Sequence, residues 1–122
     1  MSELTLDPAA FAHLLEITGD DLEFIDELID TYLADSAVQL DAMRSAAEVS
    51  DVAALVRPAH SLKSSSANVG AMALAEACRS LEADGRAGTV ADMVARVDTC
   101  GRSFSDVRDA LLAARAARAG PG

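Results

Sequence analysis

The fold is most clearly indicated by residues 52–70, which read VAALVRPAHSLKSSSANVG. Apolar or small side chains recur there with the helical period of about 3.6 residues, which predicts a helix with one buried face. This buried stripe consists of Val52, Leu55, Ala59, Leu62, Ser66 and Val69. Either Ser50 or Asp51 can cap the start of the helix. Pro58 removes one backbone hydrogen bond, so we expect a bend just before His60.

The same periodicity predicts four other helices, at about residues 8–17, 20–47, 71–85 and 90–115. Asp7 and Pro8 suit the start of the first, and Gly88 with Thr89 is expected to separate the last two and cap the final helix. Four substantial amphipathic helices with short connections predict an all-α fold. We expect an antiparallel four-helix bundle with a short N-terminal capping helix.

The chain has 122 residues, which predicts a single domain. We expect residues 1–122 to form one unit with its core at about 4–115 and a frayed tail at 116–122. The net charge is −10, and the first 51 residues hold 13 of the 20 acidic side chains. Nucleic acids and anionic membranes select basic surfaces, so neither is an expected partner.

No apolar stretch approaches the roughly 18 residues that a membrane span needs, and residues 1–7 do not resemble a signal peptide. We therefore expect a cytoplasmic protein. Cys78 and Cys100 form no C-x-x-C pair and lie on apolar helical stripes, which predicts buried thiols. We expect no metal site and no cofactor. The sequence lacks a G-x-x-x-x-G-K-[ST] phosphate loop, so ATP binding and autokinase activity are not expected.

His60 is one of two histidines, and Lys63 is the only lysine. Residues three apart are neighbours on a helix surface, so the Lys63 ammonium group is expected beside the imidazole of His60. A nucleophilic nitrogen next to a cation could accept and stabilise a phosphoryl group. From the residues alone, a metal ligand, a catalytic base and a histidine without function also remain open. His13 has no such surroundings, and we assign it no function.

Helical geometry places His60 roughly 120° from the centre of the buried stripe, so its side chain should point outward. The small residues Ser64 and Ala67 follow on the same side, and Arg57 and Ser61 flank the histidine towards solvent. A partner protein could approach His60 closely over such a low surface.

Residues 59–71, which read AHSLKSSSANVGA, resemble the signature of histidine-containing phosphotransfer (HPt) domains. The usual form is A-H-x-L-K-G-S-S, with a glycine and an alanine about ten residues after the histidine. The resemblance extends from about residue 4 to 112 and includes Leu81-Glu82 and Arg86-Ala87-Gly88. Ser64 stands where the family usually has glycine, but serine is small enough to preserve close approach.

The resemblance implies a four-helix bundle that carries a phosphoryl group in a multistep phosphorelay of two-component signalling. His60 would be the phosphoacceptor, taking the group from the aspartate of one receiver domain and passing it to another. Lys63 would offset the phosphoryl charge, and Glu82 would orient the imidazole ring. The docking surface would consist of Arg57, Ser61, Ser64, Ala67 and Arg86.

The implied partners are response-regulator receiver domains and a hybrid sensor histidine kinase, with magnesium bound by the receiver and not by this chain. We expect the chain to be a monomer and a phosphoryl carrier. Two alternatives are a phosphorylation-silent docking module and the histidine domain of a larger hybrid kinase. A hydrolase fits least, because no second histidine, catalytic carboxylate pair or serine elbow accompanies His60.

Overall fold

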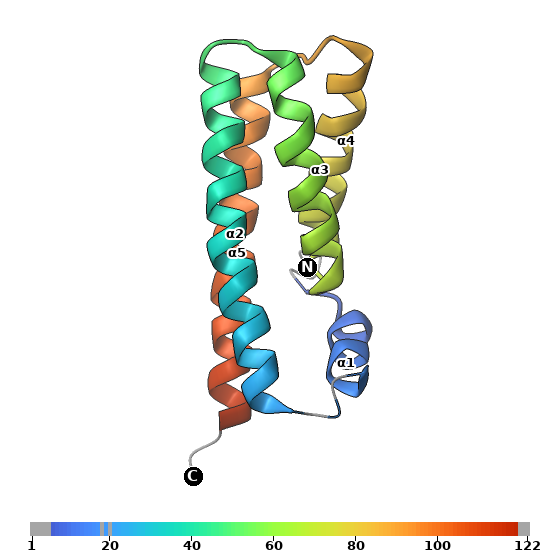
Figure 1. Cartoon of the computed structure of the whole chain (residues 1–122), viewed down its shortest axis with the longest axis vertical. Helices are drawn as coiled ribbons and strands as arrows, with labels where there is room; N and C mark the ends of the chain where they lie inside the picture. The colour runs from blue at the N-terminus through green and yellow to red at the C-terminus, as the bar shows by residue number, and fades with distance from the viewer. Residues whose placement is uncertain (1–5, 18, 20, 120–122) are drawn as a thin grey trace, which may run out of the picture.

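The structure is a computed structural model that describes residues 6–17, 19 and 21–119. These residues form helices and no strand (Figure 1). The helices are α1 (Pro8–Ile17), α2 (Leu22–Glu48), α3 (Val52–Asn68), α4 (Met72–Ala87) and α5 (Met93–Ala119). The all-α fold predicted from the sequence is confirmed, with α2–α5 as the bundle and α1 as the short N-terminal helix.

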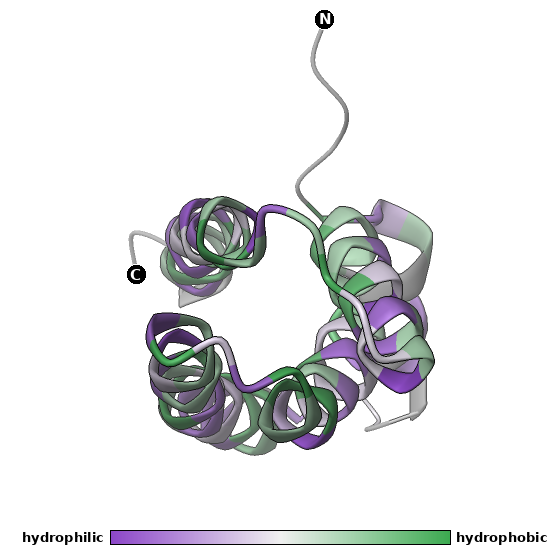
Figure 2. Cartoon of the chain, turned by 90° about the horizontal axis from the view of Figure 1, so that it is seen from above, coloured by the Kyte–Doolittle hydropathy of each residue, from purple (hydrophilic) through white to green (hydrophobic). Residues whose placement is uncertain are grey.

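Helices α2 to α5 pack in chain order, and α5 also packs against α2, so that the bundle closes on itself (Figure 2). Helices α3 and α4 are shorter than α2 and α5, and α1 lies beyond their end (Figure 1). The backbone N–H of Asp7 donates a 2.6 Å hydrogen bond to the carbonyl oxygen of Gly70, in the turn between α3 and α4. This bond joins the segment before α1 to the helix pair that carries His60.

Aspartate side chains cap the starts of α1, α2 and α3. The Asp7 carboxylate accepts from the backbone N–H of Ala9 at 2.9 Å, just before Pro8 begins α1. Of the two caps considered for α3, Asp51 is the one used, and it accepts from Ala54 N–H at 3.0 Å. Each cap satisfies one of the backbone donors that a helix start leaves without a partner.

The connection before α5 differs from the prediction. Gly88 ends α4 in the left-handed conformation, with φ of +92°, and Thr89 does not cap a helix. The chain continues through a turn to Asp92, whose φ of +52° is incompatible with a helix, so α5 begins only at Met93. The predicted start of α5 was too early, because the turn between α4 and α5 extends beyond Gly88 and Thr89 to Asp92.

The end of α5 also differs from the prediction. The helix continues to Ala119 and therefore includes residues 116–119 of the segment expected to be a frayed tail. Alanine and arginine, which make up residues 113–119, are both strong helix formers. Residues 120–122 lie outside the described part of the chain.

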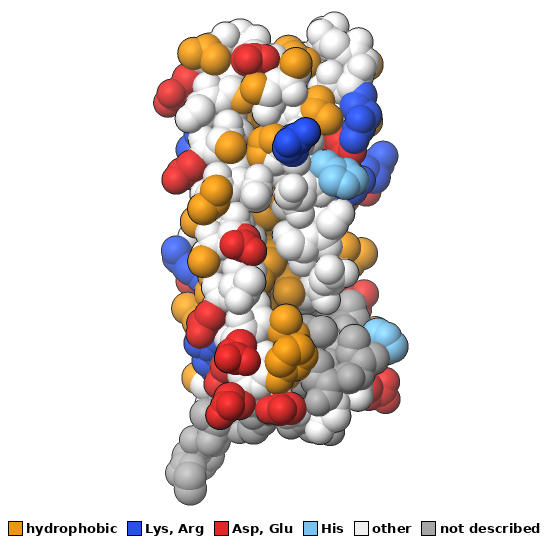
Figure 3. Space-filling model, viewed as in Figure 1, with side chains coloured by type: hydrophobic (Ala, Val, Ile, Leu, Met, Phe, Trp, Pro, Cys, Tyr) orange, Lys and Arg blue, Asp and Glu red, His pale blue; other side chains and the backbone are white. Residues whose placement is uncertain are grey.

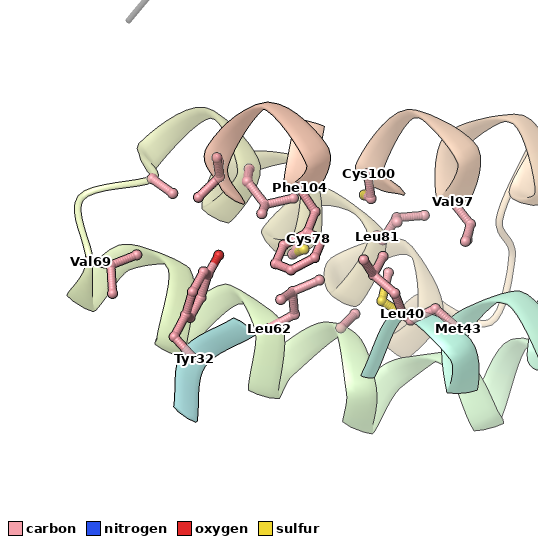
Figure 4. Packing of buried hydrophobic residues seen from close by; sticks show 14 of the residues in the cluster. Tyr32, Leu40, Met43, Leu62, Val69, Cys78, Leu81, Val97, Cys100 and Phe104 are labelled. Atoms are coloured by element: carbon pink, nitrogen blue, oxygen red, sulfur yellow. The ribbon is translucent and has the colours of Figure 1, made fainter. Parts of the chain in front are cut away.

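The core contains the predicted apolar stripes of α2 to α5 (Figure 4). Its largest fully buried side chains include Ile25, Ile29, Met43, Leu55, Leu62, Leu74, Leu81, Val97, Val107 and Leu111. Val52, from the predicted stripe of α3, is only partly buried and packs against the core, as do Leu28, Leu33 and Val90. Helix α3 continues through Pro58, which is itself buried. The bend expected there stays a prediction.

A buried polar contact sets α3 against α2. Ser66, in the predicted stripe of α3, forms a 2.8 Å hydrogen bond with the hydroxyl of Tyr32 from α2. The Tyr32 ring also packs at a tilt against Phe104 of α5, with ring centroids 6.0 Å apart (Figure 4). This hydrogen bond favours one position of α3 relative to α2, because separating the two helices would break a bond between buried hydroxyl groups.

Candidate functional site

His60 lies on the outer face of α3, in the third turn after the Asp51 cap. Its side chain is 53% exposed, whereas its neighbours Pro58 and Ala59 are buried. The outward orientation predicted from the helical period is therefore confirmed. Figure 3 shows a histidine among basic side chains on the upper half of the face formed by α2 and α3, and acidic side chains gathered over the lower end of α2.

Glu82 of α4 reaches His60 across the contact between α3 and α4. Its Oε2 lies 2.9 Å from Nδ1 of His60, and its Oε1 lies 2.7 Å from Nζ of Lys63. The Glu82 side chain is only 8% exposed. Lys63, expected beside the imidazole, is thus paired with the carboxylate that also holds the imidazole.

Arg86 completes this arrangement one turn further along α4. Its Nη2 and Nε donate to Glu82 Oε2 at 2.7 and 3.0 Å. The resemblance placed Arg86 among the docking residues, and the structure joins it to the carboxylate below the histidine. We call His60, Lys63, Glu82 and Arg86 the Glu82 cluster.

The electrostatics of the Glu82 cluster keep its carboxylate ionised. The hydrogen bond from Lys63, followed by that from Arg86, lowers the pKa of Glu82 from 4.5 to about 2, although burial acts in the opposite direction. His60 contributes a smaller lowering. At neutral pH the cluster therefore combines one carboxylate with two permanent cations, and it carries net charge +1 when the imidazole is neutral.

The ionised carboxylate also fixes the tautomer of His60. A carboxylate can only accept hydrogen bonds, so Nδ1 must carry the proton that it shares with Glu82 Oε2. The neutral imidazole then has its free lone pair on Nε2. This arrangement holds the ring in place and leaves Nε2 as the nitrogen available for chemistry.

A close approach between α3 and α4 makes these contacts possible. Gly85 of α4 is buried, and a Cβ atom added there would lie 2.8 Å from Cγ2 of Val56 on α3. Real Cβ atoms do not come so close to a neighbour. The missing side chain thus lets the turn of α4 that carries Glu82 come within reach of His60 and Lys63.

The other residues of the predicted docking surface lie on α3 around the histidine. Arg57 and Ser64 are exposed, and Ser61 and Ala67 are half-buried. Three of them are small, as the predicted low surface requires, and Ser64 stands in the position where the family signature has glycine. Their role in docking stays a prediction.

The remaining candidates lie apart from this chemistry. His13 is exposed on α1, with Nδ1 3.8 Å from Glu16 Oε1. Cys78 and Cys100 are free, buried thiols, as predicted. Within the described residues no group of three or more histidine, cysteine or acidic side chains could hold a metal ion. No helix in the same part of the chain is long and apolar enough to span a membrane.

The residues alone did not reveal how the Glu82 cluster is connected. Two signals were present in the sequence: an acidic residue next to the predicted buried Leu81, and an arginine four residues after it, a spacing that brings opposite charges together on a helix. The contacts to His60 and Lys63 required knowledge of which face of α4 meets α3.

The fold and the site define a four-helix bundle with an exposed histidine on one face, whose ring contacts a buried carboxylate. The family model "Hpt domain" matches residues 27–117, and the chain belongs to this family. The family defines the function of the chain as histidine phosphotransfer in phosphorelay signalling. This confirms the family and function that the resemblance of residues 59–71 implied.

A solved structure supports the same conclusion. The chain is similar to the crystal structure of histidine-containing phosphotransfer protein B (HptB) from Pseudomonas aeruginosa PAO1, with a TM-score of 0.83 and 34% sequence identity. The similarity covers 93% of this chain and 96% of the other. Among curated proteins, none matches this chain.

Proposed function

We propose that His60 is the phosphoacceptor of a multistep phosphorelay and that Nε2 is the nitrogen that carries the phosphoryl group. The observation that carries this proposal is the 2.9 Å contact between Nδ1 and the ionised Glu82. It engages one ring nitrogen and leaves the other, with its lone pair, on a side chain that is half exposed.

In the transfer step the Nε2 lone pair attacks the phosphorus atom of a receiver aspartyl phosphate. An N–P bond forms, the bond from the aspartate oxygen to phosphorus breaks, and the aspartate leaves as a carboxylate with the bonding electrons. Nδ1 keeps its proton, so the phosphorylated ring becomes cationic. Glu82 then faces a positive ring, which stabilises the product. The reverse step delivers the group to a second receiver.

The Glu82 cluster supplies orientation and charge for this step. Phosphoryl transfer depends mostly on positioning and on stabilisation of negative charge. Lys63 and Arg86 neutralise Glu82 and leave a net positive site, so the incoming phosphoryl oxygens do not meet an uncompensated carboxylate. We assign magnesium to the receiver partner and no cofactor to this chain.

The proposed partners are response-regulator receiver domains, which approach over Arg57, Ser61, Ser64 and Ala67, and a hybrid sensor histidine kinase upstream. We propose that the chain acts as a monomer and as a carrier that does not use ATP. A cytoplasmic location is supported by the two free thiols, because reducing compartments keep cysteines unpaired.

The test is transfer from a phosphorylated receiver domain to the parent chain, to His60→Gln and to the matched control His13→Gln. We expect acid-labile, base-stable phosphate on the parent and on the control, and none on His60→Gln. A His60→Gln variant that still supports phosphorylation of a downstream receiver would show the chain to be a silent docking module. Transfer only from an ATP-binding kinase domain would favour the histidine domain of a larger hybrid kinase.

A further inference from the structure

Two side chains of the Glu82 cluster share one acceptor atom. His60 Nδ1 and Arg86 both contact Oε2 of Glu82, at 2.9 Å for the imidazole and 2.7 Å for Nη2 of the guanidinium group. Lys63 lies instead on Oε1, at 2.7 Å. Arg86 and His60 are therefore held close together on one oxygen, whereas Lys63 lies on the other.

The two cations also differ in exposure. The Lys63 side chain is 29% exposed, and that of Arg86 is 61% exposed. A partly buried ammonium group would lose its partner and remain poorly hydrated if it left Glu82. The guanidinium group of Arg86 lies mostly in solvent, so it can turn away from the carboxylate at little cost in hydration.

Phosphorylation changes the balance of charge at Oε2. In the step proposed above, the imidazole changes from neutral to cationic while Nδ1 keeps its proton. The positive charge of the ring then offsets the negative charge on Oε2, so the positive charge of Arg86 is no longer needed there. At the same moment a doubly charged phosphoryl group with three acceptor oxygens is placed on the same ring.

We propose that Arg86 is a phosphoryl-binding residue that turns from Glu82 to the phosphoryl oxygens when His60 is phosphorylated. This inference rests on the proposed role of His60. A guanidinium group suits the task because its planar set of donors can bind two phosphoryl oxygens at once. Lys63 remains on Oε1 and keeps Glu82 in place under the ring.

Arg79 provides a matched control. It lies on α4 two turns before Arg86, is also exposed, and pairs with Glu76 three residues earlier through Nη2 and Nε. Arg79→Ala removes the same charge from the same helix and likewise breaks a local ion pair. It does not touch the Glu82 cluster.

The test titrates the phosphoryl group by phosphorus NMR. Full-length protein is phosphorylated with phosphoramidate, a small-molecule donor, so that the measurement does not require a receiver. A nearby cation favours the dianion, so Arg86→Ala should raise the midpoint of the phosphoryl titration by roughly half to one pH unit. Arg86→Lys should restore part of the shift, and Arg79→Ala should leave the midpoint at the parental value.

Making Arg86→Ala in the variant Glu82→Gln distinguishes direct binding of the phosphoryl group by Arg86 from an effect that acts through Glu82. In Glu82→Gln there is no carboxylate to hold Arg86, so a direct contact predicts that Arg86→Ala still raises the midpoint, by at least as much. A shift that disappears in Glu82→Gln would overturn the inference, because Arg86 would then act only by neutralising Glu82. A midpoint in Arg86→Ala equal to that in Arg79→Ala would overturn it as well.

These outcomes are independent of the relay. If phosphorylated receivers do not transfer to the parent chain, but the phosphoramidate-treated protein shows the expected shifts, then the relay proposal fails and the role of Arg86 stands. If receivers transfer normally and the shifts are absent, then the role of Arg86 fails and the relay proposal stands.

Discussion

Two contacts between helices in this bundle use charged side chains in opposite ways. Between α3 and α4, one buried carboxylate, Glu82, is hydrogen-bonded to the imidazole of His60 and the guanidinium group of Arg86, and it forms an ion pair with Lys63. Between α2 and α5 the polarity is reversed, since one arginine, Arg115, reaches two carboxylates. Its Nε lies 3.1 Å from Asp26 and its Nη2 lies 2.9 Å from Asp30.

The difference between the two contacts lies in the solvation of their carboxylates, since Arg115 is 26% exposed and Lys63 is 29% exposed. Asp30 is exposed and Asp26 is half-buried, so water and salt screen their attraction to Arg115, and such pairs contribute little to stability. Glu82 is buried, so its hydrogen bonds cannot be replaced by water without moving α4. The contact at α2 and α5 adds to an apolar interface, whereas the contact at α3 and α4 orients the imidazole ring of His60.

The largest effect on stability is expected from removing the central charged group of each contact, which is Glu82 in one and Arg115 in the other. Glu82→Ala should lower the free energy of unfolding by about 1–3 kcal/mol, because several charge-assisted hydrogen bonds are lost. The loss should stay within this range, because the mostly exposed Arg86 can turn into solvent and only the partly buried Lys63 would be left without its partner. Arg115→Ala should cost about 1 kcal/mol or less. Urea unfolding of the two variants measures both values.

The dependence of these two stability losses on salt concentration tests the same comparison. Raising the ionic strength should reduce the small cost of Arg115→Ala and change that of Glu82→Ala much less, because screening acts on exposed charges. Equal costs for the two variants, with equal dependence on salt, would contradict the distinction between the two contacts.

A smaller effect should appear in the dependence of stability on pH. The pKa of Glu82 is about 2 in the folded chain and 4.5 as an ordinary glutamate. The stability contributed by its ionised form is therefore complete above pH 4.5 and is lost as the pH falls from 4.5 towards 2. The parent should be more stable than Glu82→Gln at pH 7, and this advantage should shrink over that range.

Urea midpoints of both proteins at several pH values test this expectation. The difference between parent and variant is the informative quantity, because the other carboxylates titrate in both. A difference that stays constant between pH 5 and pH 2 would show that the cations do not hold Glu82 ionised.

The contrast between the two contacts also shows how far the sequence could predict the site. The direction of His60 follows from the period of one helix, so the stripe through Leu55, Ala59 and Leu62 was sufficient to predict it. The same applies to the buried cysteines. These features depend only on which face of a single helix is apolar.

The pairing of Lys63 with Glu82 does not follow from one helix, because it depends on how α4 packs against α3. Spacing within α3 predicted Lys63 beside His60, but a buried carboxylate on the neighbouring helix offers the ammonium group a stronger partner. Glu82 itself was assigned through the family resemblance. The late start of α5 was missed because an aspartate such as Asp92 adopts a positive φ much less often than glycine does and so signals it only weakly.

The smallest effect, and the one that tests the packing directly, compares two glycines. An added Cβ at Gly85 would meet Cγ2 of Val56 at 2.8 Å, and one at Gly101 of α5 would meet Nη2 of Arg44 at 2.6 Å. Valine is stiff, whereas the end of an arginine side chain can turn away. Alanine also favours a helix over glycine by about 1 kcal/mol.

Gly101→Ala should therefore stabilise the chain by up to about 1 kcal/mol. In Gly85→Ala the overpacking cost of about 1–3 kcal/mol should cancel or exceed that gain. It should also push Glu82 away from the histidine, which slows phosphoryl transfer. Adding Val56→Ala to Gly85→Ala creates room for the new methyl group and should restore transfer. Transfer that is normal in Gly85→Ala alone would show that the cluster tolerates a wider separation of α3 and α4, and that the glycine is not what holds Glu82 under the ring.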